Sequence, residues 1–252
     1  MIYSSNSLVK KPVISICVTT YNQEKYLKDT LDSILSQKID VLYEIIISDN
    51  GSTDKTLDIA KKYNCRITKG GLPAKARNNG AKIAKGDLFL FLDSDTILPQ
   101  NFLKKSLNEF KKRNLDLASF YLLPSNKNIF LKLGYIFFYN LPVFLLKKIT
   151  PHAAIGILIK RELFKKLNGF DETIKIAEDH DLARRAKKQK AKTGFIRSVK
   201  LITSDRRFRQ DGWVKTYLKY IFCEFHLIFL GPIRSNIVEY KFNHYKNLKN
   251  KN

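Results

Sequence analysis

The chain has 252 residues, 44% of them hydrophobic, which suffices for one large domain or two small ones with a substantial core. Forty-six Lys and Arg against 23 Asp and Glu give a formal charge of +23, which predicts polyanionic partners such as nucleic acid, anionic lipid or phosphorylated substrates. The three widely spaced cysteines argue against a disulfide framework or a zinc cluster, and the first 11 residues do not read as a signal peptide.

The first half of the chain alternates strand and helix patterns. Strands are expected at residues 13–19, 43–48, 65–68 and 88–92. Helices are expected after Asn22 as N-cap, from the cap candidates of Ser52-Thr53-Asp54 to residue 63, and over 74–85, closed by Gly86. This βαβαβαβ order predicts a doubly wound, mostly parallel α/β sheet flanked by helices. The G-x-G-x-x-G fingerprint is absent, which argues against a nicotinamide enzyme.

The second half is less regular. Helices are expected at residues 101–113, 161–167 and 178–190, and strands at 117–122 and 155–159. No internal repeat or low-complexity linker separates these segments, which favours one continuous domain over residues 1–205, followed by a basic, aromatic C-terminal extension over 206–252.

Two apolar segments raise the question of a membrane. Residues 133–146 are uncharged but shorter than a bilayer span, and residues 217–233 include Lys219, Glu224 and His226. Both fit an interfacial or buried helix better than a spanning one. For residues 133–146, core packing and membrane contact stay equally open. For residues 217–233, the flanking basic residues favour contact with an anionic membrane surface. These are Arg206, Arg207, Arg209, Lys215 and Arg234.

Carboxylates follow two of the expected strands. Asp49 comes after one buried strand, and Asp93 and Asp95 come after the strand at 88–92. Ligands bind outside the carboxyl ends of the strands in open α/β sheets, and carboxylate pairs suit Mg²⁺ or Mn²⁺ held through substrate phosphates. An acidic turn that solvates the end of the strand is the alternative. A further acid, Asp179, lies near the start of an expected helix.

Six short motifs, in this order, resemble those of the family 2 inverting glycosyltransferases, which have the GT-A fold. They are Val18-Thr19-Thr20-Tyr21-Asn22, Ser48-Asp49-Asn50-Gly51-Ser52-Thr53-Asp54, Ala76-Arg77-Asn78-Asn79-Gly80, Phe91-Leu92-Asp93-Ser94-Asp95, Asn168-Gly169-Phe170-Asp171-Glu172 and Glu178-Asp179-His180-Asp181-Leu182. Each motif alone is weak, but the ordered set is specific and covers roughly residues 13–185. The resemblance implies a GT-A-like catalytic domain over residues 1–205.

The resemblance also implies how a UDP- or GDP-linked sugar donor would be bound. Thr19 and Tyr21 would frame the nucleoside, and Asp49 would accept a hydrogen bond from it; capping of the next helix is the alternative role for Asp49. Arg77 would approach the phosphates, unless it is an ordinary solvated charge. Asp95, with Asp93, would hold Mg²⁺ or Mn²⁺ on the diphosphate.

By the same resemblance, Asp179 would be the general base that takes the proton of an acceptor hydroxyl while the anomeric centre inverts. The neighbouring Glu178 would raise the pKa of Asp179 if it faces the same way. On sequence alone, Glu178, Asp179 and Asp181 would only supply favourable charge to the first turn of a helix. The ordered motifs reverse that preference.

The remaining predictions concern the acceptor. Arg206, Arg207 and His152 are candidates for contacts with phosphate or acceptor, although a basic loop and an ordinary loop histidine explain them nearly as well. The chain lacks the Q-x-x-R-W spacing of processive synthases, which predicts transfer of a single sugar, to a saccharide or a lipid-linked acceptor. The expected location is cytoplasmic and peripheral, at the inner face of the cell membrane.

Two other functions stay open at this stage. Acidic pairs that hold magnesium also serve nucleotidyl transfer, which would release pyrophosphate rather than a nucleoside diphosphate. The charge of +23 would also suit nucleic-acid binding, but no recognised motif supports a specific nucleic-acid partner.

Overall fold

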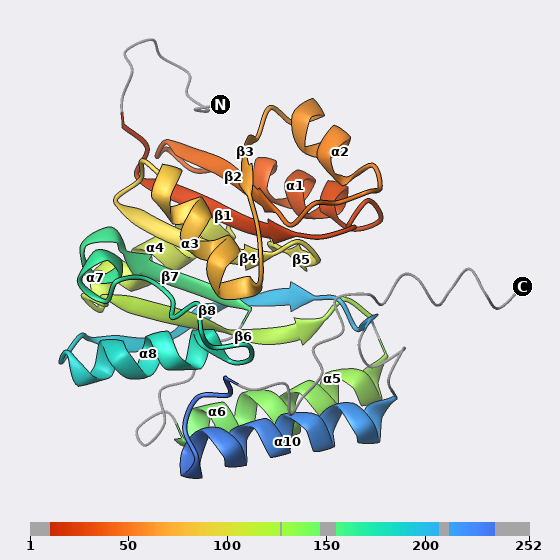
Figure 1. Cartoon of the computed structure of the whole chain (residues 1–252), viewed down its shortest axis with the longest axis vertical. Coiled ribbons are helices and arrows are strands. Elements are labelled where there is room, and N and C mark those ends of the chain that lie inside the picture. Colours follow the sequence, from red (N-terminus) through yellow and green to blue (C-terminus); the bar gives the residue numbers. More distant parts are fainter. Residues whose placement is uncertain (1–10, 127, 147–154, 207–211, 235–252) are drawn as a thin grey trace, which may run out of the picture.

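The core of the structure is one eight-stranded sheet with helices on both faces (Figure 1). The computed structural model describes residues 11–126, 128–146, 155–206 and 212–234. The strand order is β3-β2-β1-β4-β7-β6-β8-β5.

The first four strands are parallel neighbours, as the sequence predicts. They are β1 (Ile14–Thr20), β2 (Tyr43–Asp49), β3 (Arg66–Lys69) and β4 (Leu88–Asp93). Strand β1 lies between β2 and β4, and β3 extends the sheet beyond β2. Since β1, β2 and β4 are covered on both faces, they are continuous apolar runs rather than alternating ones.

The other half of the sheet departs from this regular pattern. Strand β7 (Gly156–Lys160) is antiparallel to both β4 and β6 (Leu117–Pro124). Strand β8 (Thr193–Thr203) pairs in parallel with β6 across an irregularity at Phe120 and Tyr121, and β5 (Thr96–Ile97) is antiparallel to β8. The sheet is therefore mostly parallel, and β5 and β8 are strands that the sequence pattern does not indicate.

Two apolar layers enclose the sheet because alternate residues of its strands point to opposite faces. One layer packs against α1 (Leu27–Leu35) and α4 (Phe102–Lys112). The other packs against α3 (Pro73–Ile83), α7 (Arg161–Lys166) and α8 (Glu178–Lys188). Helix α2 (Thr56–Lys62) lies beside α1, next to β3. The predicted helices are thus present, with ends displaced by a few residues.

Two residues that were predicted to cap helices, Asn22 and Gly86, do not do so. Asn22 does not cap α1, which starts at Leu27; it lies in the left-handed region with φ 51°, and its side-chain oxygen accepts a hydrogen bond from Thr53 N (2.8 Å). Gly86 does not close α3, which ends at Ile83. A Cβ at Gly86 would lie 2.5 Å from Ser15 N, so close packing against β1, not helix capping, explains this glycine.

The two apolar segments of the sequence form helices at one end of the long axis of the molecule (Figure 1). The first comprises α5 (Ile129–Tyr135), a π-helical turn η1 (Ile136–Asn140) and α6 (Leu141–Leu146); the second is α10 (Trp213–Phe229). The buried Asn140 side chain pairs with the backbone N and O of Leu122 in β6 (3.0 and 2.9 Å). In the described part of the chain, no helix has the length and apolar character to cross a membrane.

Candidate active site

The register of the sheet brings three of the predicted site residues together. Thr19 in β1 is the partner of Asp93 in β4, and the next residue, Thr20, is the partner of Asp49 in β2. These residues stand at the carboxyl ends of adjacent parallel strands, where α/β sheets bind their ligands. Tyr21 follows directly and is half-buried.

Asp49 organises the loop after β2. Its carboxylate accepts hydrogen bonds from the hydroxyls of Thr20 (2.9 Å) and Ser52 (2.5 Å) and from the backbone N–H groups of Gly51 (3.0 Å) and Ser52 (2.8 Å). Four donors on a buried carboxylate hold this loop in one shape. The alternative structural role of Asp49 is therefore real, although it shapes a loop and does not cap α2. A contact between Asp49 and a nucleoside stays a prediction.

A pocket of about 420 Å³ opens beside this loop. Asp49, Asn50 and Gly51 form one wall, and residues of α2 and β3 form the rest, namely Leu57, Ile67, Thr68 and Lys69. Its apolar side chains and its exposed loop backbone suit a flat base with polar edges. None of these α2 and β3 residues is among the predicted site residues, because none belongs to a motif that indicates a binding site.

Arg77 is buried at the centre of the site. Its guanidinium donates hydrogen bonds to Glu178 Oε1 and to Asp93 Oδ1, the latter at 3.1 Å, and its side chain is only 6% exposed. The guanidinium also lies over the ring of Phe170, 5.5 Å from its centroid. Arg77 is therefore not a solvated helix charge. It connects the end of β4 to the start of α8.

Glu178 and Asp179 form the first turn of α8. The preceding Ala177 adopts the left-handed conformation (φ 64°, ψ 36°), which is strained for a residue with a Cβ and is kept by the surrounding packing. Burial raises the pKa of Glu178 despite the opposing charge of Arg77, and the Asp179 charge adds to the rise. Burial likewise raises the pKa of Asp179, where Arg77 opposes the shift and Asp93 adds to it.

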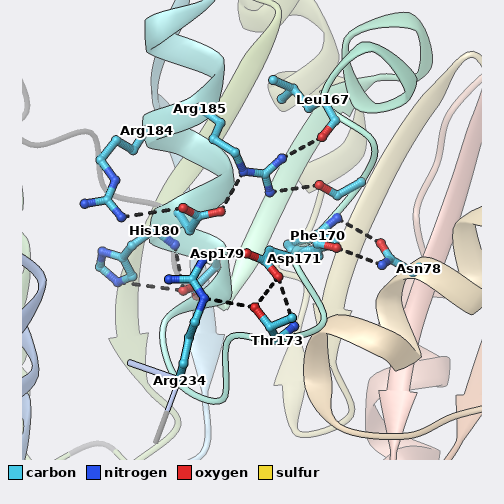
Figure 2. A network of polar contacts seen from close by, with 12 residues as sticks. Asn78, Leu167, Phe170, Asp171, Thr173, Asp179, His180, Arg184, Arg185 and Arg234 are labelled. Carbon is cyan, nitrogen blue, oxygen red and sulfur yellow. Dashed lines mark hydrogen bonds and ion pairs between the residues drawn. The ribbon is translucent and has the colours of Figure 1, made fainter. Parts of the chain in front are cut away.

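A second set of polar contacts fixes α8 against the preceding loop. Arg185 of α8 points toward Leu167 (Figure 2) and donates to its carbonyl oxygen at 2.6 Å. It also donates to the carbonyl oxygen of Gly169 (2.8 Å) and, through Nε, to the Asp181 carboxylate (2.6 Å). Asn78 of α3 brackets Phe170 through its backbone N and O, both at 2.9 Å. Asp181 is thus a structural residue, and this bracing holds Asp179 in place.

His180 faces its neighbour in the sequence. Its backbone N–H donates to Asp179 Oδ1 at 2.9 Å, and its ring Nε2 lies 3.9 Å from the same oxygen (Figure 2). The Asp179 side chain keeps 13% of its surface exposed. A partly accessible carboxylate with a raised pKa has the properties required of a general base.

Asp95 pairs with Arg206, which follows β8 and is distant from Asp95 in the sequence. Arg206 NH2 lies 3.3 Å from Asp95 Oδ2, while Arg206 NH1 donates to Gln23 (3.1 Å) and its guanidinium stacks over Tyr26 (5.4 Å). Pairing of β5 with β8 leads the chain to this point, and Ser204 N donates to Asp95 O (3.2 Å). Arg206 therefore lies beside Asp95, held by Gln23 and Tyr26, neither of which was among the predicted site residues. A contact between Arg206 and a phosphate or the acceptor stays a prediction.

The donor set at Asp93 and Asp95 fits a divalent cation that is shared with a substrate. In the described residues, no group of three or more His, Cys, Asp or Glu forms a complete metal cage. Mg²⁺ and Mn²⁺ need only one or two protein carboxylates when substrate phosphates supply the other oxygens. Both carboxylates now face a guanidinium, Arg77 for Asp93 and Arg206 for Asp95.

Two of the predicted contact residues, His152 and Arg207, lie outside the described residues.

Comparison with known proteins gives a consistent family. The model of Glycosyl transferase family 2 matches residues 15–167. The poly(ribitol-phosphate) beta-N-acetylglucosaminyltransferase TarS of Staphylococcus aureus is 37% identical over 99 residues, which cover 36% of this chain and 17% of TarS. An uncharacterized glycosyltransferase of Rickettsia typhi is 30% identical over 195 residues, covering 68% of this chain and 57% of that protein. The chain thus spans only part of the length of these relatives.

Solved structures agree on the fold. TarS residues 1–349 in complex with UDP superpose with a TM-score of 0.60 at 24% identity, covering 76% of this chain and 60% of that one. A mannosyltransferase of Pyrobaculum calidifontis in complex with GDP-Man and Mn²⁺ superposes with a TM-score of 0.62 at 20% identity, covering 85% and 65%. At these identities the likeness establishes the fold.

Replacement of Arg77 by Met should destabilise the protein by about 3–5 kcal/mol at pH 8, because it leaves a buried carboxylate without its cation. The loss of unfolding free energy should be smaller at pH 5. The pKa of Glu178 is raised in the folded state, so protonation at low pH favours folding and this contribution is lost as pH rises through the folded pKa. Urea unfolding at both pH values measures the two losses.

The exposed Lys75 lies on the same helix, and Lys75→Met is the matched control, expected within about 0.5 kcal/mol of the unmodified protein. The double variant Arg77→Met with Glu178→Gln should recover part of the stability. Equal losses at both pH values would show that Arg77 acts through packing alone.

Proposed function

The chain belongs to glycosyl transferase family 2 and has the GT-A fold, and we propose that it moves one sugar from a UDP- or GDP-linked donor to an acceptor hydroxyl, with inversion. The observation that carries this proposal is the buried Arg77, which holds Asp93 and Glu178 on the same guanidinium. Through it, the strand-end carboxylates and Asp179 become two sides of one site.

The strand ends would bind the donor. Thr19 and Tyr21 would frame the nucleoside, and the pocket beside Asp49 offers room for its base. Asp93 and Asp95 would hold Mg²⁺ or Mn²⁺ on the diphosphate. When bound, this ion would offset negative charge on the departing nucleoside diphosphate. The complex of the Pyrobaculum mannosyltransferase with GDP-Man and Mn²⁺ supports this assignment.

Arg77 and Arg206 would take part in the same step. Both guanidinium groups already face the carboxylates that would receive the ion, so each lies within reach of a diphosphate bound there. Arginine suits this place because it stays charged and presents several donors to phosphate oxygens. Entry of a cation beside Asp95 would free Arg206 to turn toward the phosphates.

Asp179 would act as the general base. Deprotonation of the acceptor hydroxyl must accompany bond formation, on the face of the sugar opposite the leaving diphosphate. Its raised pKa makes Asp179 a stronger base than an ordinary aspartate, and its partly exposed oxygens remain accessible. Glu178, which is almost fully buried and bound to Arg77, is placed to support Asp179 and not to contact the acceptor.

The acceptor would be a saccharide of the cell envelope, free or lipid-linked. Relatives named for transfer to poly(ribitol-phosphate), in Staphylococcus aureus and Bacillus spizizenii, support a hydroxyl-bearing polymer as acceptor, and a relative named chondroitin synthase, in Escherichia coli, supports a saccharide. Arg206, with Arg207 and His152, would contact acceptor or phosphate. We propose residues 1–205 as the catalytic domain and residues 206–252 as an extension. The protein would work as a peripheral protein at the inner face of the membrane.

Replacement of Asp179 by Asn should lower sugar transfer by about 10²–10⁴-fold, because the base is lost while the shape of the side chain stays. A screen of UDP- and GDP-sugars, with release of free nucleoside diphosphate as the readout, measures the rate. Donor affinity should stay within about twofold. Glu162→Gln, in the first turn of α7, is the matched control. Release of pyrophosphate instead would indicate nucleotidyl transfer, and full activity of Asp179→Asn would remove its assigned role.

Replacement of Asp95 by Ala should abolish most of the gain in UDP affinity that Mn²⁺ provides, an effect of about tenfold or more, because one of the two carboxylate ligands is lost. Titration calorimetry of UDP with and without Mn²⁺ gives this gain directly. The control is Asp87, which is exposed and directly precedes β4, at the end of the strand opposite to Asp95. Asp87→Ala should keep the full effect of Mn²⁺. An unchanged gain in Asp95→Ala would place the ion elsewhere.

The pH dependence of transfer should have an acid limb well above the ordinary pKa of aspartate, because burial raises the pKa of Asp179 to about 6. The base is active when deprotonated, so the rate rises as pH passes upward through this pKa and is lost below it. Arg77 opposes this rise, so Arg77→Met should move the limb to still higher pH. Rate profiles at saturating donor and Mn²⁺ test this, and a limb at the ordinary pKa of aspartate in the unmodified protein would contradict it.

A further inference from the structure

The helices at one end of the molecule expose an unusual amount of apolar surface. All but four of the large hydrophobic side chains that are exposed in the described residues belong to α5, η1, α6 and α10; the others are Leu230, which directly follows α10, and Val13, Ile67 and Leu72. We call the outward residues of these helices, together with Leu230, the apolar face. They are Ile129, Phe130, Leu133, Ile136, Phe137, Leu141, Phe144, Leu145, Leu218, Ile221, Phe222, Phe225, Phe229 and Leu230.

These helices already have an inner side that packs on the domain. Leu131 and Tyr135 belong to the main core, and Asn140 is hydrogen-bonded to the backbone of β6. On α10, Thr216 and Leu227 are buried, and the chain that follows forms a bridge between Ile233 and Ile176. The outward apolar residues are therefore additional to what folding requires.

The apolar face repeats with the period of a helix. On α10, Leu218, Ile221, Phe225 and Phe229 recur every three or four residues, so they form one stripe along the helix. The exposed fraction of the residue is 76% at Phe130 and 73% at Phe229. Monomeric proteins rarely expose contiguous apolar surfaces of this kind unless something binds there.

The charge around the apolar face selects its partner. Residues 129–146 contain no Asp or Glu, and residues 213–229 contain one, Glu224. Basic residues stand within and beside the helices, among them Lys132 and Lys215; Arg234, just beyond α10, is already paired with Asp171 (2.8 Å). An apolar stripe with basic flanks is the pattern of helices that lie in a membrane interface on anionic lipid.

A second copy of this chain is a poorer partner. Each copy carries a formal charge of +23, so bringing two of these basic ends together would add repulsion to the contact. An anionic bilayer offers both an apolar interior and a negative surface. A partner that supplies both also satisfies the apolar side chains and the lysines at once.

We infer that the apolar face docks on an anionic lipid bilayer, with α5, α6 and α10 lying in the plane of the interface and the sheet remaining in water. The inference extends the proposed peripheral location by assigning the surface that meets the lipid. Helix α10 begins at Trp213, a short way along the chain after Arg206, which contacts Asp95 in the site. Docking would therefore bring the part of the site around Arg206 and Asp95 toward the headgroups.

Sedimentation with vesicles tests the inference. The full chain should bind vesicles of equal parts phosphatidylcholine and phosphatidylglycerol at least tenfold more tightly than pure phosphatidylcholine. The pair Phe130→Ser with Phe137→Ser, and the pair Phe225→Ser with Phe229→Ser, should each weaken binding about tenfold or more, since each removes two apolar side chains from the interface. Val13→Ser with Leu72→Ser is the matched control and should bind as the unmodified chain does.

Circular dichroism establishes that each variant is folded, and sedimentation needs neither donor nor acceptor, so a failure of the proposed transfer leaves this result unaffected. Absence of vesicle binding by the full chain overturns the inference, as does equal binding by all variants or equal binding to both lipid mixtures. Dimerisation that the Phe variants abolish, without vesicle binding, would identify a second copy as the partner instead.

Discussion

One buried guanidinium holds the candidate site together. Arg77 comes from α3, yet it binds the last residue of β4 and the first residue of α8, which lies 101 positions further along the chain. A buried carboxylate such as Glu178 is costly without a compensating cation, and the same holds for the cation. The buried charge of Arg77 and the buried carboxylate of Glu178 therefore stabilise each other, and with them the packing of α3 against β4 and α8. The geometry between the strand ends and Asp179 follows from that mutual dependence.

The same cluster separates two electrostatic tasks. Asp93 and Asp95 are each paired with an arginine, and in the proposed function they would hold a cation on the substrate phosphates. At Glu178 and Asp179, burial raises the pKa of both carboxyl groups despite Arg77. In the proposed function, carboxylates of one chemical type would thus serve as ligands on one side and as a base on the other.

The parts of the fold that sequence predicts are those with strong local patterns. Strands β1, β2 and β4 are long apolar runs, and their order along the chain determines where Asp49 and Asp93 emerge. Strand β8 escapes prediction because its outward residues, such as Arg197 and Lys200, are charged and its pairing with β6 is interrupted. Asn22 and Gly86 mislead because the residue types that cap helices also serve loops and close packing.

The site, too, has residues that the sequence predicts and residues that it does not. Strand-end acids can be found from pattern, since topology brings the ends of parallel strands together. The role of Asp179 rests on family resemblance alone, because no local signal places α8 beside β4. The pairing of Arg77 with Glu178 is beyond prediction for the same reason: it is a tertiary contact between distant segments, and Arg77 is one of 46 basic residues. What distinguishes it is burial, which only the folded chain determines.

The basic excess of the chain needs a second explanation beyond the site. The proposed donor side has two buried or nearly buried arginines, Arg77 and Arg206, and both are already paired with carboxylates. Recognition of a diphosphate therefore accounts for little of the +23 charge. Most of the excess must act at the surface, where it raises attraction to extended anions over a range of about 8–10 Å at ordinary ionic strength. A planar anionic surface satisfies that attraction together with the apolar helices, whereas a soluble substrate satisfies neither.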